Sequence, residues 1–267
     1  MEVINGEFYM LGCREDDPRC IRSPEELKRL ISEIGFLPLF SNTIPGFSVE
    51  ERTLASAWWT GDPASDPWTW REFLSSDPEL AYGKFYDKKA GYVSKEWFPA
   101  FANYRRNGYD FDELVGDELV PYRNQQIMEA FSLQEDLTGL ELMSYEVRER
   151  VSVKNHEGCM TELQMQTYLL MSAFRQKKNK KGQPYGWHVA AFTTPETKWG
   201  YKYISSGYHE KPELSWERIT DQIRKHFPQA GEAELKKLLG IRYPGESIQK
   251  EQKARKTKPV QSAGGAE

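Results

Sequence analysis

Two aspartates among tryptophans are the side chains of this sequence best placed to do chemistry. Asp62 and Asp66 each precede a proline in the segment SAWWTGDPASDPWTWREF, residues 56–73. Indole rings can stack on a planar ligand, and a carboxylate beside that ligand can act on it. The segment therefore predicts a pocket in which Asp62 or Asp66 is catalytic. The stacking residues of this pocket would be Trp58, Trp59, Trp68 and Trp70.

The same aromatic residues fit two other interpretations. Residues 58–111 contain 15 of the chain's 35 aromatic side chains, enough for a rigid core in which each Asp-Pro pair begins a helix or a turn. Alternatively, this aromatic block is a surface that docks a protein, because Trp, Tyr and Arg dominate such interfaces. Residue types alone leave the three interpretations open.

Helix signals before and inside the block predict the elements that position it. Ser23 as N-cap, Glu26 three residues later and Gly35 as the stop predict a helix over residues 24–34. Asp66, followed by proline, predicts the start of a second, short helix that carries the later tryptophans.

A second capping box, Ser48 with Glu51, predicts a helix that carries Trp58 and Trp59 as far as Gly61. Further along, rings alternate with polar residues over AYGKFYDKKAGYVS, which predicts a hairpin or an extended crossing. A helix is then expected over residues 96–106, and Asn-Gly ends it.

The middle of the chain has the element order of a winged helix-turn-helix module. Helices are expected over PYRNQQIMEAF, over LTGLELMSYEVRERV as one or two segments, and over a short stretch, CMTELQMQ, with Thr161 as N-cap. Two β-rich runs, YLLMSAFRQ and YGWHVAAFTT, follow around a glycine-containing loop. This order predicts a recognition helix over residues 161–166 that binds nucleic acid, with the loop as the wing.

The loop between these strands is strongly basic. There is no acidic residue between Phe174 and Tyr185. Each phosphate contact that such a loop made would add about one unit to the salt dependence of DNA binding. The alternative is a hairpin turn whose lysines are simply solvated, and the sequence favours neither interpretation over the other. The predicted nucleic-acid-binding residues of the loop are Arg175, Lys177, Lys178, Lys180 and Lys181.

Composition bounds the function classes. A net charge of −4 excludes a uniformly basic nucleic-acid coat, although a local basic face is compatible with it. The N-terminus does not resemble a signal peptide, and no apolar run is long enough to span a membrane. Three cysteines, Cys13, Cys20 and Cys159, suggest a reducing, cytoplasmic setting, in which Cys13 and Cys20 could pair only on oxidation.

Motifs for other chemistries are missing from the sequence. Its four histidines have no metal-ligand spacing, and His188 lies in an alternating strand where a structural role is expected. Phosphate loops, dinucleotide fingerprints and nucleophile elbows are not found, so no cofactor and no metal are predicted. Together the signals predict a mainly helical α+β fold, in which winged-helix-like units pack around an aromatic hub.

The expected organisation has four parts. An aromatic-rich helical domain covers residues 1–115, and a winged-helix-like domain covers residues 116–200. A helical segment follows over residues 201–247, in which Ser215 is expected to cap a helix. The Lys-rich tail, residues 248–267, is expected to be disordered.

Several blocks resemble a group of bacterial proteins related to AlkZ. They are LPLFSNTIPGFSVEE, WWTGDPASDPWTWR, YGKFYDKKAGYVSKEWFP and LQMQTYLLMSAFRQKKNKKGQPYGW, and the resemblance extends from about Phe36 to Trp216. AlkZ-type proteins are winged-helix DNA glycosylases that act on alkylated or crosslinked purines. The resemblance implies a DNA-binding winged-helix protein, with base excision as its enzymatic variant. The competing class is a non-catalytic protein that uses the Trp-rich block to bind a protein or small molecule.

The resemblance also implies candidate catalytic glutamines. The AlkZ-type signature is Gln-apolar-Gln, which this sequence contains once, as Gln164-Met165-Gln166. In the glycosylases the motif lies in the N-terminal half, whereas here it falls on the expected recognition helix. Residues two apart on a helix point about 200° away from each other, so both glutamines cannot line one pocket of a regular helix. The alternative catalytic groups are Asp62 and Asp66, which could stabilise an oxocarbenium-like sugar or position water beside a flipped base.

Overall fold

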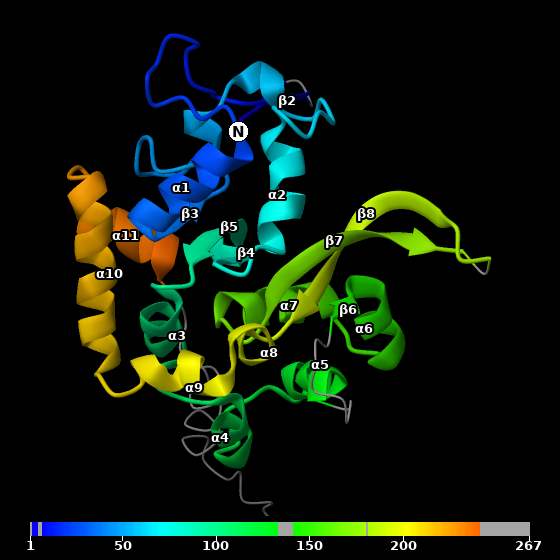
Figure 1. Cartoon of the computed structure of the whole chain (residues 1–267). Coiled ribbons are helices and arrows are strands. Elements are labelled where there is room, and N and C mark those ends of the chain that lie inside the picture. The colour runs from blue at the N-terminus through cyan, green and yellow to red at the C-terminus, as the bar shows by residue number, and fades with distance from the viewer. Residues whose placement is uncertain (1, 5–6, 133–140, 180, 241–267) are drawn as a thin grey trace, which may run out of the picture.

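An antiparallel sheet of six strands, in the order β3-β5-β4-β7-β8-β6, runs through the molecule (Figure 1). The computed structural model describes residues 2–4, 7–132, 141–179 and 181–240. The sheet strands are β3 (Phe36–Pro38), β4 (Leu80–Tyr86), β5 (Lys89–Ser94), β6 (Leu142–Met143), β7 (Leu170–Lys178) and β8 (Pro184–Thr193). A separate two-stranded ladder pairs β1 (Glu2–Ile4) with β2 (Glu7–Tyr9). Helices pack around the sheet, which confirms the expected α+β class.

The first hairpin of the sheet is where the alternating rings predicted it. β4 and β5 are joined at Asp87 and Lys88, which both have positive φ. A side chain at Gly91 is excluded, because its Cβ would lie 2.5 Å from the ring of Tyr86. The hydroxyl of Tyr86 donates across the hairpin to the carbonyl of Tyr92 at 2.5 Å. Hairpin and ring are therefore fixed together in the core.

Local capping signals correctly predicted the helices around this hairpin. In α1 (Pro24–Ile34), the Ser23 hydroxyl accepts from the Glu26 amide and Gly35 ends the helix in the left-handed region. α2 (Pro67–Ser75) begins after Asp66, as expected. α3 (Phe98–Arg106) ends at Asn107, whose φ is 55°.

The helix predicted from Ser48 and Glu51 is wrong. The pair does form, since the Ser48 hydroxyl accepts from the Glu51 amide and donates to its carboxylate. Only two short 3₁₀ turns follow, Glu50–Arg52 and Ala55–Ala57. The reason is Thr53, whose extended backbone interrupts the helix while its hydroxyl bonds the Val49 carbonyl. Trp58 and Trp59 consequently lie in irregular backbone.

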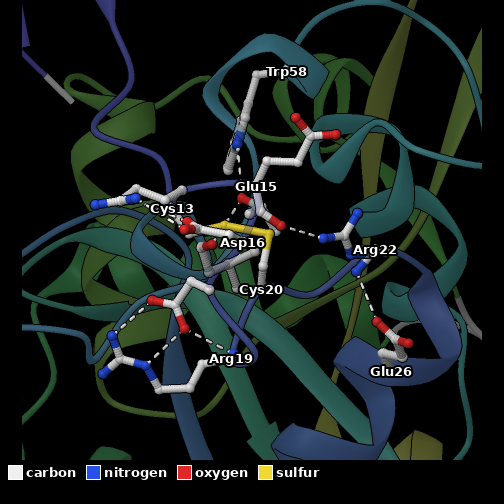
Figure 2. The surroundings of a disulfide bond; sticks show 12 residues. Cys13, Glu15, Asp16, Arg19, Cys20, Arg22, Glu26 and Trp58 are labelled. Carbon is white, nitrogen blue, oxygen red and sulfur yellow. Dashed lines mark hydrogen bonds and ion pairs between the residues drawn. A yellow bond between two sulfur atoms is a disulfide. The ribbon is translucent and has the colours of Figure 1, made fainter.

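A disulfide joins Cys13 to Cys20 beside this irregular segment (Figure 2). Backbone hydrogen bonds from Cys13 to Thr53 and from Ile21 to Arg52 hold both ends of the closed loop. Within the loop, the carbonyl of Glu15 accepts from Arg22 Nη2 at 2.5 Å. The third cysteine, Cys159, is buried and free.

The helices before the second hairpin follow the expected order with one correction. They are α4 (Phe111–Gly116), α5 (Tyr122–Ser132), α6 (Ser144–Arg150) and α7 (His156–Met165). Thr161 is not an N-cap, because α7 begins five residues earlier after Asn155. The Thr161 hydroxyl instead donates to the Glu157 carbonyl within the helix. Residues 137–140, part of the segment expected to be helical before α6, lie outside the described residues.

The C-terminal helices return to cover α3. They are α8 (Pro195–Trp199), α9 (Tyr201–Ile204), α10 (Pro212–His226) and α11 (Glu232–Leu239), with a 3₁₀ turn at Ser205–Gly207. Ser215 does not cap α10, which begins at Pro212. Its buried hydroxyl accepts from Asn103 of α3 at 2.9 Å, so the residue joins two helices instead. The expected disordered tail lies outside the described residues.

The sheet crosses the domain boundary expected after residue 115. β4 and β5 precede that boundary, whereas β6, β7 and β8 follow it. One apolar cluster contains Phe36, Phe85 and Phe101 as well as residues of α7, α10 and α11. The division into domains stays a prediction. Among the described helices, none has the length and apolar character needed to cross a membrane.

Candidate functional site

The carboxylate of Asp66 is buried and fully engaged in hydrogen bonds. One oxygen accepts from the amides of Trp59 and Trp68 at 3.1 and 2.8 Å. The other accepts from the Gly61 amide at 2.9 Å and the Thr69 hydroxyl at 3.1 Å. With 1% of its surface exposed, Asp66 closes the preceding loop onto the start of α2. Its catalytic role stays a prediction, and this geometry favours the alternative of a helix cap.

Asp62 is the exposed member of the pair. Hydrogen bonds from the Ser65 hydroxyl and the Ala64 amide lower the pKa of its carboxyl. This is the arrangement of a turn-forming aspartate. Asp62 therefore stays ionised at neutral pH and faces solvent, a few residues away from the buried Asp66.

The four tryptophans of the block do not share one open pocket. Trp70 is completely buried, and Trp58 is 5% exposed with its indole nitrogen donating to the Thr53 hydroxyl. Trp68 is half-buried, and Trp59 is exposed. The rings of Trp58 and Trp68 both approach Phe40, at 6.0 and 6.5 Å between centroids. Most of the block thus serves as core, and its stacking role stays a prediction.

Arg71 joins this block to the second hairpin. Its guanidinium carbon lies 3.9 Å from the ring centre of Trp68 and 4.0 Å from that of Phe174 on β7. Beside it, Glu72 Oε2 lies 2.5 Å from Nδ1 of His188 on β8. The structural role expected for His188 is consistent with this contact. Both pairs hold α2 against the base of the hairpin.

The outer part of the β7–β8 hairpin carries the predicted basic residues. Figure 1 shows the hairpin extending away from the helices. Lys178 and Lys181 are exposed, and the ammonium of the half-buried Lys177 lies 4.9 Å from the ring centre of Tyr145. The exposed Arg175 pairs with Glu141. Lys180 lies outside the described residues.

The same hairpin carries an exposed aromatic pair that was not among the predicted site residues. Trp187 is 92% exposed and Tyr185 is 52% exposed, and Tyr185 lies opposite Lys177 in the strand pairing. The available signal was their position directly after the lysine-rich loop. In the structure the strand register shifts between them, with Gly186 at a positive φ of 74°. Basic and aromatic side chains are thereby combined on the outer hairpin.

The two glutamines of the Gln164-Met165-Gln166 motif have different surroundings. Gln164 is buried, accepting from the Lys84 amide of β4 at 3.1 Å and donating to the Met160 carbonyl at 2.9 Å. Gln166 lies just past the end of α7 and is 7% exposed. Thr161, also predicted to bind nucleic acid, is half-buried, and its hydroxyl accepts from the Lys84 ammonium at 3.2 Å. The catalytic and binding roles of these residues stay predictions.

Two further ionisable groups, Lys198 and His156, are largely enclosed by the fold but differ in their hydrogen bonding. Burial lowers the pKa of Lys198 to about 8, and its ammonium donates to the carbonyls of Ser75 and Leu80. His156 is buried, and neither ring nitrogen has a hydrogen-bond partner in the described part of the chain. No group of three potential metal ligands occurs among the described residues.

The fold and these sites define a mixed α+β protein whose antiparallel sheet includes a basic hairpin with an exposed tryptophan. The chain belongs to the family described as AlkZ related, whose sequence profile matches residues 21–240. This confirms the resemblance inferred from the sequence blocks. No curated protein sequence matches the chain.

One solved structure that is similar to this chain is the DNA glycosylase AlkZ of Streptomyces sahachiroi. The sequence identity is 11%, the TM-score is 0.37 and the similarity covers 83% of this chain. The chain spans 60% of the length of that glycosylase structure.

Proposed function

We propose that this protein binds nucleic acid through the β7–β8 hairpin. The observation that carries the proposal is Trp187, a large ring 92% exposed on a strand beside exposed lysines. Stacking of such a ring on a base contributes about 1–3 kcal/mol and requires no particular sequence. An aromatic platform with ammonium groups around it is suited to a nucleic-acid strand, whose bases stack while its phosphates meet the lysines.

Local charge supports the same surface. The chain carries a net charge of −4, but the ten residues between Phe174 and Tyr185 contain five basic and no acidic side chains. Arg175 is paired with Glu141, which leaves Lys177, Lys178 and Lys181 as the described residues most available to phosphates. Three such contacts would give a salt dependence with a slope of about −3 on logarithmic axes.

In this proposal the hairpin makes the main contact, and α7 contributes less. Helices α5, α6 and α7 precede the hairpin in the order of a winged helix, which supports α7 as the proposed recognition helix. Its exposed side carries Glu157 and Glu162, however, whose carboxylates repel phosphates. The buried side of α7 packs on β4 through Gln164. Thr161 lies between these two sides and is proposed to make only a minor contact with the nucleic acid.

Base excision on a flipped purine is the enzymatic variant of the proposal, supported by membership of the AlkZ-related family. Such chemistry requires a group that stabilises the sugar or positions water. Of the two predicted carboxylates, Asp62 presents oxygens to solvent, whereas Asp66 is saturated. The proposal therefore retains Asp62 as the catalytic carboxylate. It also places the protein in the cytoplasm, where the Cys13–Cys20 pair would be reduced.

The test is fluorescence anisotropy with labelled duplex, single-stranded and abasic-site DNA across a salt series. We expect binding that weakens steeply with salt, with a preference for the abasic duplex in the enzymatic variant. Base release from alkylated duplex DNA, lost on Asp62→Asn, would support catalysis separately. Absence of binding to all three DNAs at low salt would overturn the proposal.

A further inference from the structure

Gln166 is a largely buried residue whose side-chain amide is unused by the fold. The residue is 7% exposed, and its side chain makes no hydrogen bond to any described residue. Only its backbone is engaged, with the amide donating to the Glu162 carbonyl and the carbonyl accepting from the Thr167 hydroxyl. An amide that lines a pocket and has no partner within the protein is a candidate for binding a ligand.

Two consecutive buried arginines of α3 hold the backbone on either side of Gln166. Arg105 donates to the Met165 carbonyl at 2.9 Å. Arg106 donates to the hydroxyl and carbonyl of Thr167 at 3.2 and 2.7 Å. Both arginines are at most 1% exposed. Fixing a binding group through its buried neighbours is how proteins organise a site in advance of the ligand.

Gln166 lines a pocket of about 700 Å³ between α7 and the β4–β5 turn. This volume lies in the range of small-molecule sites. The pocket reaches from Asn155 to Gln166 along α7, a length of roughly 16 Å at 1.5 Å per residue. The turn is held to the helix end, because the Lys88 amide donates to the Met165 sulfur.

The two walls of the pocket carry opposite charges. Lys84 and Lys88 come from the hairpin wall, together with Asp87 at the turn, and the Lys84 ammonium reaches the Thr161 hydroxyl on the helix. Glu157 and Glu162 lie on the helix wall, where Glu157 also pairs with Arg148 at 3.0 Å. A polyanion would be repelled, because three carboxylates outnumber the two ammonium groups. A neutral ligand would remove water from these charges without offering them a charged partner in its place. A ligand with one charge of each sign complements both walls.

We infer that this pocket binds a small zwitterion with an amide group, of the amino-acid or short-peptide class. The ligand carboxylate faces Lys84 and Lys88, and its ammonium faces Glu157 and Glu162. Its amide pairs with Gln166, which can donate and accept at once. The inference is independent of DNA binding by the hairpin.

Isothermal titration calorimetry of the full-length protein tests the inference with four compounds. L-glutamine and the tripeptide glycyl-glutaminyl-glycine distinguish a free amino acid from a peptide, and saturable binding of either supports the site. N-acetyl-L-glutamine lacks the cation and L-glutaminamide lacks the carboxylate. Each of these two is expected to bind at least tenfold more weakly than L-glutamine. No saturable heat with L-glutamine or the tripeptide at millimolar concentration would overturn the inference.

Matched variants locate the site. Gln166→Ala removes an amide that the fold does not use, so the melting temperature should change little while ligand affinity falls at least tenfold. Gln164→Ala removes a buried hydrogen-bonded amide two residues away, and should lower the melting temperature without changing ligand affinity. Equal binding by the wild type and Gln166→Ala, or tighter binding of the neutral nucleoside adenosine than of L-glutamine, would contradict the proposed ligand class.

Discussion

The aromatic block and the β7–β8 hairpin use the same residue types for opposite purposes. Both combine tryptophan with basic side chains, yet Trp70 in the block is completely buried and Trp187 on the hairpin is 92% exposed. In the block, helix α2 packs on β4 and β7 and buries Trp70, which stabilises the fold. In the outer hairpin, β7 and β8 pair only with each other among the described strands, and the rings of Tyr185 and Trp187 are exposed to solvent. Exposure distinguishes a core from a binding surface where residue type does not.

The cations of the two regions differ in the same way. Arg71 lies between the rings of Trp68 and Phe174 and is 7% exposed, so its charge is used inside the molecule. Lys178 and Lys181 extend into water, where they can meet an external anion. Arginine suits the buried site because its planar guanidinium stacks on both faces. The difference predicts that substitutions in the block reduce stability and substitutions on the hairpin reduce binding.

The largest expected effect is on stability, at Asp66. Asp66→Ala removes a buried carboxylate that accepts four hydrogen bonds, three from backbone amides and one from the Thr69 hydroxyl, so we expect a loss of about 3 kcal/mol. Asp62→Ala, at the exposed aspartate of the same loop, should cost less than about 1 kcal/mol. Chemical denaturation of both variants measures the difference. Equal stability of the two would contradict the capping role.

The second prediction concerns the hairpin lysines. Replacing Lys177, Lys178 and Lys181 by alanine should reduce DNA affinity roughly 30-fold, about 2 kcal/mol, because three phosphate contacts are lost. The salt slope should fall by about three, with unchanged melting temperature. A control triple variant at the exposed lysines Lys202, Lys211 and Lys225 changes the net charge equally. If both variants weaken binding to the same extent, charge in general and not the hairpin determines affinity.

Stacking by Trp187 is the third prediction. Trp187→Ala should weaken single-stranded DNA binding about tenfold, since base stacking contributes about 1–3 kcal/mol. Trp187→Phe should restore most of the affinity. Trp59→Ala, at a partly exposed tryptophan of the block, is the matched control and should leave DNA binding unchanged. Fluorescence anisotropy across a salt series separates this effect from that of the lysines, because the salt slope should stay the same.

Sequence reasoning succeeded where structure is determined within a few residues. Ser23 with Gly35 and Asp66 with the following proline mark helix ends through local hydrogen bonds and backbone geometry, and the structure has those helices. It failed at Thr53, whose carbonyl accepts from the distant Cys13 amide, and at Asn155, whose backbone is left-handed; both overrode weaker local signals. Such competition is not visible in the pattern of residues.

The site depended more on contacts between distant residues. The exposure of Trp187 follows from how far the hairpin extends beyond its neighbours, which the sequence does not give. Gln166 was named because of a motif, but its free amide is apparent only once Arg105 and Arg106, some 60 residues earlier, are seen to hold its neighbours. The sequence could identify these residues by type, whereas their roles depend on three-dimensional packing.

The smallest effect contrasts a buried histidine with an exposed one. Burial lowers the pKa of His156, Arg148 lowers it further, and Glu157 opposes them. As the pH drops below the ordinary histidine pKa of about 6.5, the unfolded chain therefore binds a proton that the folded protein does not. The free energy of unfolding consequently decreases as the pH is lowered. His156→Leu should remove this part of the decline between pH 7.5 and 5, measured as melting temperature. His209→Asn, at an exposed histidine, is the matched control, and an equally steep decline in His156→Leu would show that other groups cause it.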